Sequence, residues 1–182
     1  MARLSCCCHL VLPVRKQSRK QSAVRLHGAA VPCGHRDLPA CRNNSKRRGE
    51  LAELAFVYKA ASLGFGVAKP YGESERFDFI VSSRRRLWRV QVKSCHQSGK
   101  GRYGIHAYGN SNQDRQIYTR DEIDFIVVYL VSEDAWYIIP IEAIGRSKAI
   151  YLYPHGSRRA SCKFEKHREA WSLLESGRRL NP

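Results

Sequence analysis

The sequence predicts an α/β fold with a mixed central sheet flanked by helices, and three observations indicate it. Residues 46–63 repeat apolar side chains at helical spacing. Residues 125–130 and 135–139 are continuous apolar runs, which are typical of strands buried on both faces. Residues 163–176 return to helical spacing. A helix, then strands, then a closing helix favours one α/β domain, which we place at residues 45–178.

The first helix has a start signal and a stop signal. Asn44 precedes it and is a good N-cap, because its side-chain oxygen accepts a hydrogen bond from a free backbone N–H. Gly64 follows it and suits the left-handed conformation that often ends a helix. Between them Leu51, Leu54 and Tyr58 follow helical spacing, and we expect Leu51 and Leu54 to mark the buried stripe.

The strands follow the first helix at short intervals. Residues 82–86 form a short polar stretch, which predicts a hairpin loop between two of the strands. Residues 94–117 are rich in Gly, Ser, Asn and Gln, and such a long connection is often functional. The expected strands are residues 65–68, 77–81, 87–93, 103–106, 125–130, 135–139 and, at an edge, 150–153.

The chain is strongly basic. Of its 182 residues, 32 are Lys or Arg and 16 are Asp or Glu, which gives a formal net charge of +16. This excess implies a polyanionic partner, with nucleic acid ahead of a membrane surface. No run of 18 apolar residues occurs and no basic amphipathic helix stands out, so we expect no membrane association.

Residues 1–48 carry +10 of the formal net charge of +16, and we interpret residues 1–44 as a basic flexible extension because they show little hydrophobic periodicity. Their Arg-rich, Ser-rich and acid-poor composition also fits an organelle transit peptide. The apolar stretch from Leu4 to Val14 imitates a secretory signal, and a start assigned too far upstream is a third explanation. Cys95 and Cys162 fit reduced thiols. We therefore expect an intracellular, bacterial-like cytoplasmic protein, with organelle targeting as the alternative.

The candidate site centres on two neighbouring strands. Asp78 interrupts the apolar run Phe77 to Val81, and Gln91 and Lys93 alternate with apolar residues thirteen and fifteen positions later. Because residues two apart in a strand share a face, Gln91 and Lys93 project together. The hairpin brings Asp78 beside that face. A carboxylate, an amide oxygen and an ammonium at one point suit a hard divalent cation with a nearby water or phosphate.

Two further acids, Glu50 and Glu53, lie three apart in the first turns of the first helix and so share a face. A glutamate beside the buried stripe reaches the end of the sheet, whereas an acid near a helix N-terminus is also favoured by the helix dipole alone. We assign the dipole role to Glu50 and leave both roles open for Glu53. Asp124, next to a buried strand, is interpreted as a structural hydrogen-bond partner.

An ordered set of motifs resembles the PD-(D/E)XK nuclease superfamily. The basic-Gly-Glu pattern of the first helix is similar to archaeal Holliday-junction resolvases, and the Gln-x-Lys variant is more similar to the group I intron-associated endonucleases. The resemblance covers about residues 46–145. It is carried by residues 46–53, Gly64-Phe65, Phe77-Asp78, Gln91-Val92-Lys93, residues 122–125 and residues 136–141.

The resemblance implies a restriction-endonuclease-like core and Mg²⁺-dependent (or Mn²⁺-dependent) hydrolysis of DNA. It assigns metal binding to Asp78, Gln91 and Glu53, and catalysis to the same residues together with Lys93. Phe77 stands where the family often has proline, and Gln91 stands where it usually has an acid. A neutral amide adds no charge to the metal site. The alternatives are therefore a catalytically inactive nucleic-acid-binding module on the same fold and a Holliday-junction-resolvase-like nuclease.

The expected partner is double-stranded or branched DNA, and cutting two strands favours a homo-oligomer. Cations in the hairpin loop and in the long connection suit phosphate contacts, although a solvated basic surface explains each of them equally well. The candidate nucleic-acid contacts are Arg84, Arg85, Arg86, Lys100, Arg102, Arg115 and Arg120.

Overall fold

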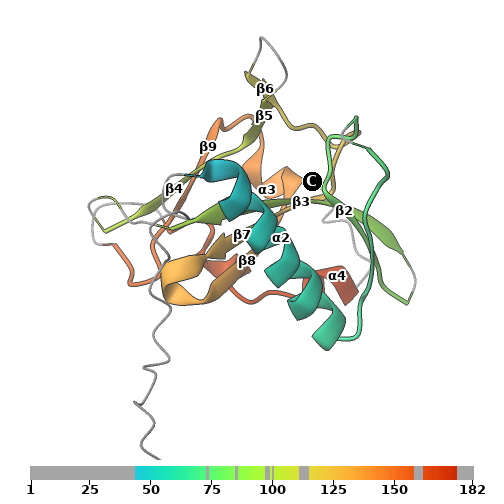
Figure 1. Cartoon of the computed structure of the whole chain (residues 1–182). Coiled ribbons are helices and arrows are strands. Elements are labelled where there is room, and N and C mark those ends of the chain that lie inside the picture. The colour runs from blue at the N-terminus through green and yellow to red at the C-terminus, as the bar shows by residue number, and fades with distance from the viewer. Residues whose placement is uncertain are drawn as a thin grey trace, which may run out of the picture. The chain divides into compact units, whose positions relative to one another are not determined.

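The computed structural model describes residues 44–72, 74–84, 86–96, 99, 101–110, 115–157 and 162–175 (Figure 1). The predicted basic extension therefore lies outside the described residues, apart from Asn44. No helix in these ranges is long and apolar enough to span a membrane.

A five-stranded mixed sheet forms the centre of the fold. Its strand order is β1-β2-β3-β7-β8, and only β3 and β7 run parallel, while the other neighbours are antiparallel. The predicted mixed sheet and the hairpin between the second and third strands are confirmed. The strands are β1 (Gly66–Ala68), β2 (Phe79–Ser82), β3 (Leu87–Cys95), β7 (Phe125–Leu130) and β8 (Ala135–Pro140).

Two small antiparallel pairs lie beside this sheet. Strand β4 (Tyr103–His106) pairs with β9 (Ala149–Leu152), so both predicted short strands exist. Strand β5 (Tyr108–Asn110) pairs with β6 (Arg115–Ile117) inside the segment that we expected to be a polar connection. Three-residue strands of polar sequence carry almost no alternation, and this is why the sequence did not indicate the second pair.

Helix α2 (Ser45–Ser62) begins and ends as expected. The Arg47 N–H donates to the Asn44 side chain at 3.0 Å, and Gly64 adopts a φ of +86°. The expected buried stripe is wrong, however, because Leu51 and Leu54 are 48% and 67% exposed. The face that packs on the sheet consists of Ala52, Phe56 and Ala60, all buried.

The choice of this face has a packing reason. Two alanines allow the helix axis to approach the sheet closely, and the Phe56 ring fills the space between them. Its centroid lies 5.4 Å from that of Phe79 and 6.2 Å from those of Trp136 and Trp171. One aromatic residue therefore gives more buried contact than the leucines on the outer side of the helix.

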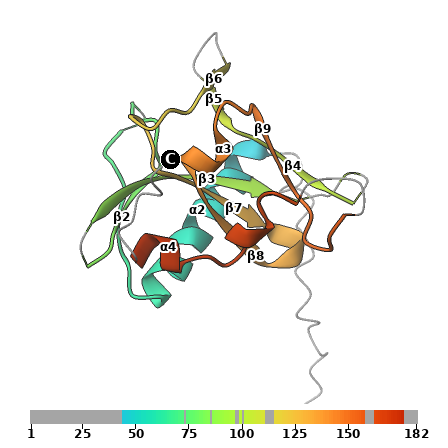
Figure 2. The ribbon, with the colours of Figure 1, turned by 180° about the vertical axis from the view of Figure 1, so that it is seen from behind.

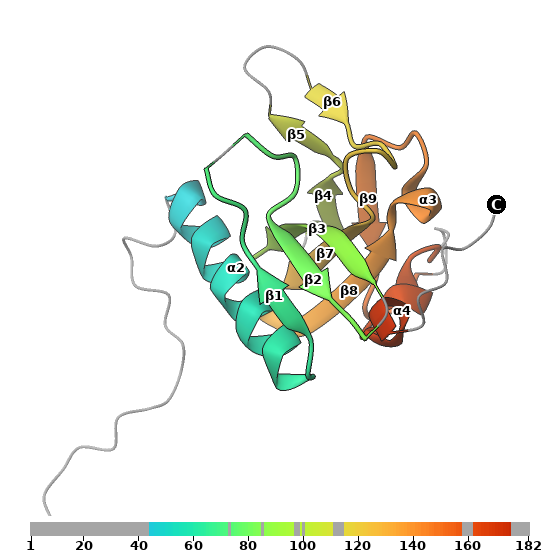
Figure 3. The ribbon, with the colours of Figure 1, turned by 90° about the vertical axis from the view of Figure 1, so that its right-hand side faces the viewer.

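Two apolar layers cover the two faces of the sheet. Figure 3 shows α2 on one side and β4, β9 and the short helix α3 (Ile141–Ile144) on the other. Figure 2 views the molecule from the side of β9 and α3. Trp88, Val90 and Val92 of β3 belong to the layer beneath α2. Alternation along the strand therefore turns Arg89, Gln91 and Lys93 to the opposite face.

The predicted closing helix over 163–176 is wrong. The segment contains the 3-10 turn η2 (Glu165–His167), an extended Arg168, and the short helix α4 (Ser172–Glu175). Side-chain and backbone groups of this segment pair with β8: the Glu169 N–H donates to the Trp136 carbonyl at 2.7 Å, and the Trp136 N–H donates to the Glu169 carboxylate at 2.8 Å. These bonds satisfy the free edge of β8, which a continuous helix would leave unpaired.

Candidate active site on strand β3

Asp78 lies directly before β2 and is held by the neighbouring strand. Its N–H donates to the Val90 carbonyl at 2.9 Å. Its carboxylate oxygen Oδ2 accepts two hydrogen bonds, from the Val92 N–H at 2.7 Å and from Gln91 Nε2 at 2.6 Å. The structure therefore brings Asp78 and Gln91 together, as the hairpin argument expected.

Burial is the main effect that raises the pKa of Asp78 above its ordinary value. The negative charge of Glu53 acts in the same direction, whereas the Val92 N–H, the Lys93 ammonium and the Gln91 amide lower the pKa. Asp78 and Glu53 are thus close enough to repel each other. A bound cation would remove this repulsion, as expected for carboxylates that share a metal.

Lys93 lies on the same face of β3 as Gln91, and burial is the main effect that lowers its pKa. Asp78 opposes this shift, and Arg76 adds to it. The Lys93 ammonium lies 5.5 Å from the ring centroid of Tyr118, and the Arg76 guanidinium lies 4.9 Å from the same centroid. Burial raises the Tyr118 pKa to about 12, so the phenol is neutral at physiological pH.

Glu53 reaches the site from α2, but in this structure it binds a lysine. The Glu53 carboxylate accepts a hydrogen bond from Lys69 Nζ at 2.8 Å. Because Lys69 is largely exposed, this pair adds little to stability. Glu53 is thus available to a cation near Asp78. Glu50 is exposed and lies beyond the first turn of α2, so the dipole role that the sequence favours for it stays a prediction.

The donors at this point suit a hard divalent cation. They are the Asp78 carboxylate, the Gln91 amide oxygen, the neighbouring Val92 carbonyl and the Glu53 carboxylate, and oxygen ligands are those that Mg²⁺ prefers. The Val92 carbonyl lies 3.3 Å from Gln91 Nε2. Among the described residues no group of three or more His, Cys, Asp or Glu side chains gathers. The site therefore depends on the amide and carbonyl oxygens more than an all-carboxylate site does.

A cavity of about 630 Å³ opens beside these groups, on the face of the sheet opposite α2. Its lining combines side chains of β3 with those of the two small strand pairs. The lining residues are Gln91, Lys93, Ser94, Gly104, Ile105, His106, Tyr108 and Tyr118.

The predicted nucleic-acid contacts are more scattered. Arg84 and Arg86 are exposed in the β2–β3 turn, about 20 Å along β3 from Lys93 at roughly 3.3 Å per residue. The Arg102 guanidinium lies 4.4 Å from the Tyr151 ring centroid, and Arg120 pairs with Glu142 at 3.6 Å. Arg85 and Lys100 lie outside the described residues, and Arg115 is described only as part of β6. The structure does not bring Arg84 and Arg86 to the candidate catalytic residues.

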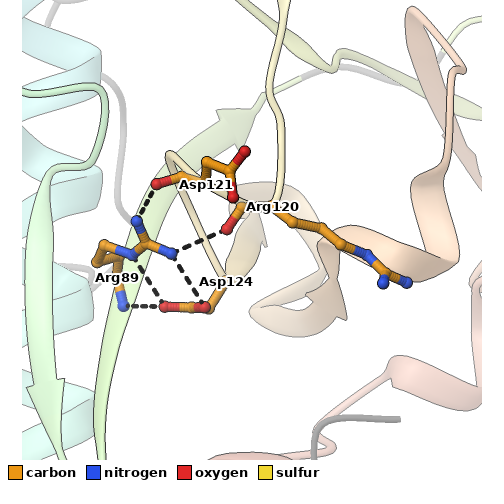
Figure 4. A network of polar contacts seen from close by, with 4 residues as sticks. All are labelled: Arg89, Arg120, Asp121 and Asp124. Carbon is orange, nitrogen blue, oxygen red and sulfur yellow. Dashed lines mark hydrogen bonds and ion pairs between the residues drawn. The ribbon is translucent and has the colours of Figure 1, made fainter. Parts of the chain in front are cut away.

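Arg89 fixes the loop that precedes β7 (Figure 4). Its backbone N–H and Nε donate to Asp124 Oδ2 at 2.9 and 3.2 Å. Its guanidinium also donates to the carbonyls of Asp121 and Arg120. Asp124 therefore has the structural role that the sequence indicated, since it joins the start of β7 to β3.

Sequence reasoning missed Arg76 and Tyr118. Arg76 follows a polar loop, and Tyr118 follows a strand that was not predicted, so no spacing pointed to either. Arg76 also pairs with Glu122 at 3.3 Å and donates to the Gln116 carbonyl at 3.1 Å. The one sequence feature that could have pointed to Arg76 is its position two residues before Asp78.

Comparisons with known proteins agree with this arrangement. A model of the PD-(D/E)XK endonuclease family matches residues 43–174. The structure of a bacterial homing endonuclease, I-Ssp6803I, superposes with a TM-score of 0.63 at 30% sequence identity, covering 72% of this chain and 93% of that one. This match confirms the restriction-endonuclease-like core.

A second solved structure, the Holliday junction resolvase Hjc of Archaeoglobus fulgidus, gives a TM-score of 0.40 at 16% identity, over 60% of this chain and 90% of that one. A comparison with curated proteins finds no match.

Proposed function

The chain belongs to the PD-(D/E)XK endonuclease family, and from this premise we propose that it is a Mg²⁺-dependent endonuclease that hydrolyses phosphodiester bonds of DNA. The observation that carries the proposal is the contact of Asp78 with Gln91 and Val92 beside the half-buried Lys93. The homing-endonuclease relative and the net charge of +16 support DNA as the substrate. Cutting both strands requires two sites, and we propose that paired copies provide them.

Asp78, Gln91, the Val92 carbonyl and Glu53 would hold the metal. When bound, Mg²⁺ polarises a phosphate oxygen and makes a water molecule more acidic. The residues of the chain do the rest. Lys93 stabilises the negative charge that develops on the phosphoryl oxygens, and its partly buried position strengthens this effect. Gln91 must turn its amide to present Oε1 in place of Nε2, and the two orientations are equal in shape.

The test measures cleavage of plasmid and branched DNA with Mg²⁺, Mn²⁺ or EDTA. We expect cleavage with either metal and none with EDTA. Asp78→Asn and Lys93→Ala each lower the rate by at least roughly a hundredfold. Asp78→Asn keeps an acceptor oxygen for the Val92 N–H, so folding is preserved and circular dichroism checks it. Asp121→Asn, an exposed acid in the loop before β7, is the matched control and retains full activity.

The neutral amide of Gln91 favours one other function, a catalytically inactive nucleic-acid-binding module on the same fold. In that case the chain binds DNA but cleaves no substrate with either metal, and Asp78→Asn leaves DNA binding unchanged. Preference for a four-way junction over plasmid would instead indicate a resolvase-like nuclease.

A further inference from the structure

Two cavities lie on either side of the candidate catalytic residues. The first is the cavity of about 630 Å³ described above, which we call the strand-side cavity. The second, the helix-side cavity, has a volume of about 500 Å³. It is lined by Glu50, Glu53, Leu54, Val57, Val67, Lys69 and Phe79. Both volumes lie in the range of roughly 300–1,000 Å³ that is typical of ligand sites, so size does not distinguish them.

Charge distinguishes the two cavities. The strand-side cavity contains Lys93 and His106 and no carboxylate among the described residues that line it. The helix-side cavity contains two carboxylates, and its single cation, Lys69, is already paired with Glu53 at 2.8 Å. A phosphodiester strand carries one negative charge per nucleotide, so like-charge repulsion disfavours the helix-side cavity.

The strand-side cavity also offers donors at suitable positions. Along β4 Tyr103 and Ile105 are buried, whereas Gly104 and His106 are exposed, so His106 faces outward beside a residue without a side chain. The His106 ring packs against Tyr108, with centroids 4.9 Å apart. This contact orients the imidazole. Lys93, on the same face of β3 as Gln91, adds an ammonium to the same lining.

We propose that the strand-side cavity is the binding site for the DNA backbone next to the cleaved bond. His106 donates a hydrogen bond to a phosphate oxygen, and the Tyr108 ring packs against the adjoining sugar or base. The proposal rests on the proposed function for its substrate. It goes further by naming the side of the sheet along which the strand runs and the residues that contact it.

The experiment observes binding without catalysis. The probe is a thymidine nucleotide with a phosphate on each sugar hydroxyl, added to the full chain in EDTA and followed by NMR. We expect saturable shifts of the His106 and Tyr108 ring resonances and no shift of the Val57 and Val67 methyl resonances in the helix-side cavity. Shifts confined to the valine methyls, or no saturable shift at all, would overturn the proposal.

A pair of histidine variants gives the energetic test. His106→Gln weakens nucleotide binding by roughly tenfold, the contribution of one hydrogen bond to a charged phosphate. His155→Gln is the control, because His155 is exposed and pairs with Glu133 at 3.1 Å, outside the cavity lining. Equal affinities of the two variants would refute the assignment. The binding experiment contains no metal, so its result does not depend on cleavage. If the chain binds the nucleotide in this cavity but cleaves no DNA, the proposed function is refuted and the binding site is not.

Discussion

Two cations, Lys93 and Arg76, contact the ring of Tyr118. Its ring is 5% exposed, with the Lys93 ammonium and the Arg76 guanidinium each over it. The backbone of Gly109 passes so close that an added Cβ would lie 3.2 Å from the Tyr118 hydroxyl. The ring is therefore fixed on its edge by β5 and on its face by the cations. We infer that it positions Lys93 toward Asp78 through a cation–π contact.

Replacing the ring should separate this role from simple packing. Tyr118→Phe keeps the aromatic face, so cleavage stays within about twofold of the parent chain. Tyr118→Leu removes the face and lowers kcat by roughly tenfold with little change in KM, since a desolvated cation–π contact contributes on the order of 1–2 kcal/mol.

The Lys93 side-chain NMR resonances provide a measurement that does not depend on activity. They carry an aromatic ring-current shift in the parent chain and in Tyr118→Phe, and lose it in Tyr118→Leu. Tyr103→Leu is the control for core damage, because Tyr103 is equally buried and its hydroxyl binds Glu133 at 2.6 Å. A ring-current shift that persists in Tyr118→Leu would contradict the role of the ring.

At the scale of the elements, the Arg89–Asp124 pair joins β3 and β7, the parallel pair of the central sheet. Parallel neighbours have no direct turn between them, so their ends need a separate attachment. Arg89 provides it by binding Arg120, Asp121 and Asp124 of the incoming loop. The Asp124 side chain is only 11% exposed, and the Arg89 guanidinium pairs with it.

Arg89→Ala should therefore cost roughly 2–4 kcal/mol of unfolding free energy, because it removes a guanidinium that pairs with a largely buried carboxylate and binds two loop carbonyls. Arg120→Ala is the matched control. Its ion pair with Glu142 is 52% exposed on the arginine side, and its loss should cost less than about 1 kcal/mol. Urea denaturation measures both variants. Equal losses would show that the loop attachment contributes nothing beyond a surface ion pair.

Long periodic segments were predictable from the sequence, and elements defined by tertiary contacts were not. The runs at 125–130 and 135–139 became β7 and β8, and the alternation about Gln91 gave the correct face of β3. The buried face of α2 and the structure of the segment 163–176 were predicted wrongly. Leu51 and Ala52 both fit a helical period, and only the ring of Phe56 against the sheet decides between the two faces.

The candidate site shows the same division. Asp78, Gln91 and Lys93 were predicted because strand alternation and one hairpin relate them locally. Tyr118 joins them through β5 and β6, whose short polar strands have no pattern of their own. The spacing of residues in a sequence indicates contacts along one element or across one turn. It does not indicate a contact such as that of Tyr118 with Lys93, which depends on how a distant loop folds back onto the sheet.

At the scale of the whole molecule, one buried histidine links global stability to pH. His167 is 4% exposed in η2, and its Nε2 has no hydrogen-bond partner within the described part of the chain. Burial, followed by the nearby charges of Lys166 and Lys163, lowers its pKa from 6.5 to about 4. The folded closing segment 162–175 therefore contains His167 in its neutral form.

The sign of the pH effect follows from this lowered pKa. Above about pH 6.5 the histidine is neutral in both the folded and the unfolded chain, so its contribution to stability is complete. As the pH falls toward 4, His167 is protonated in the unfolded chain but stays neutral in the folded chain. The free energy of unfolding therefore falls by roughly 3 kcal/mol. Below that pH the contribution no longer changes.

His167→Leu keeps an apolar group of similar size and cannot bind the proton, so it should lose less stability over the same interval. Urea titrations of both chains at about pH 7 and about pH 4.5 give the difference. Parallel losses in the two chains would mean that carboxylates alone set the acid sensitivity and that the packing of the closing segment does not depend on a neutral His167.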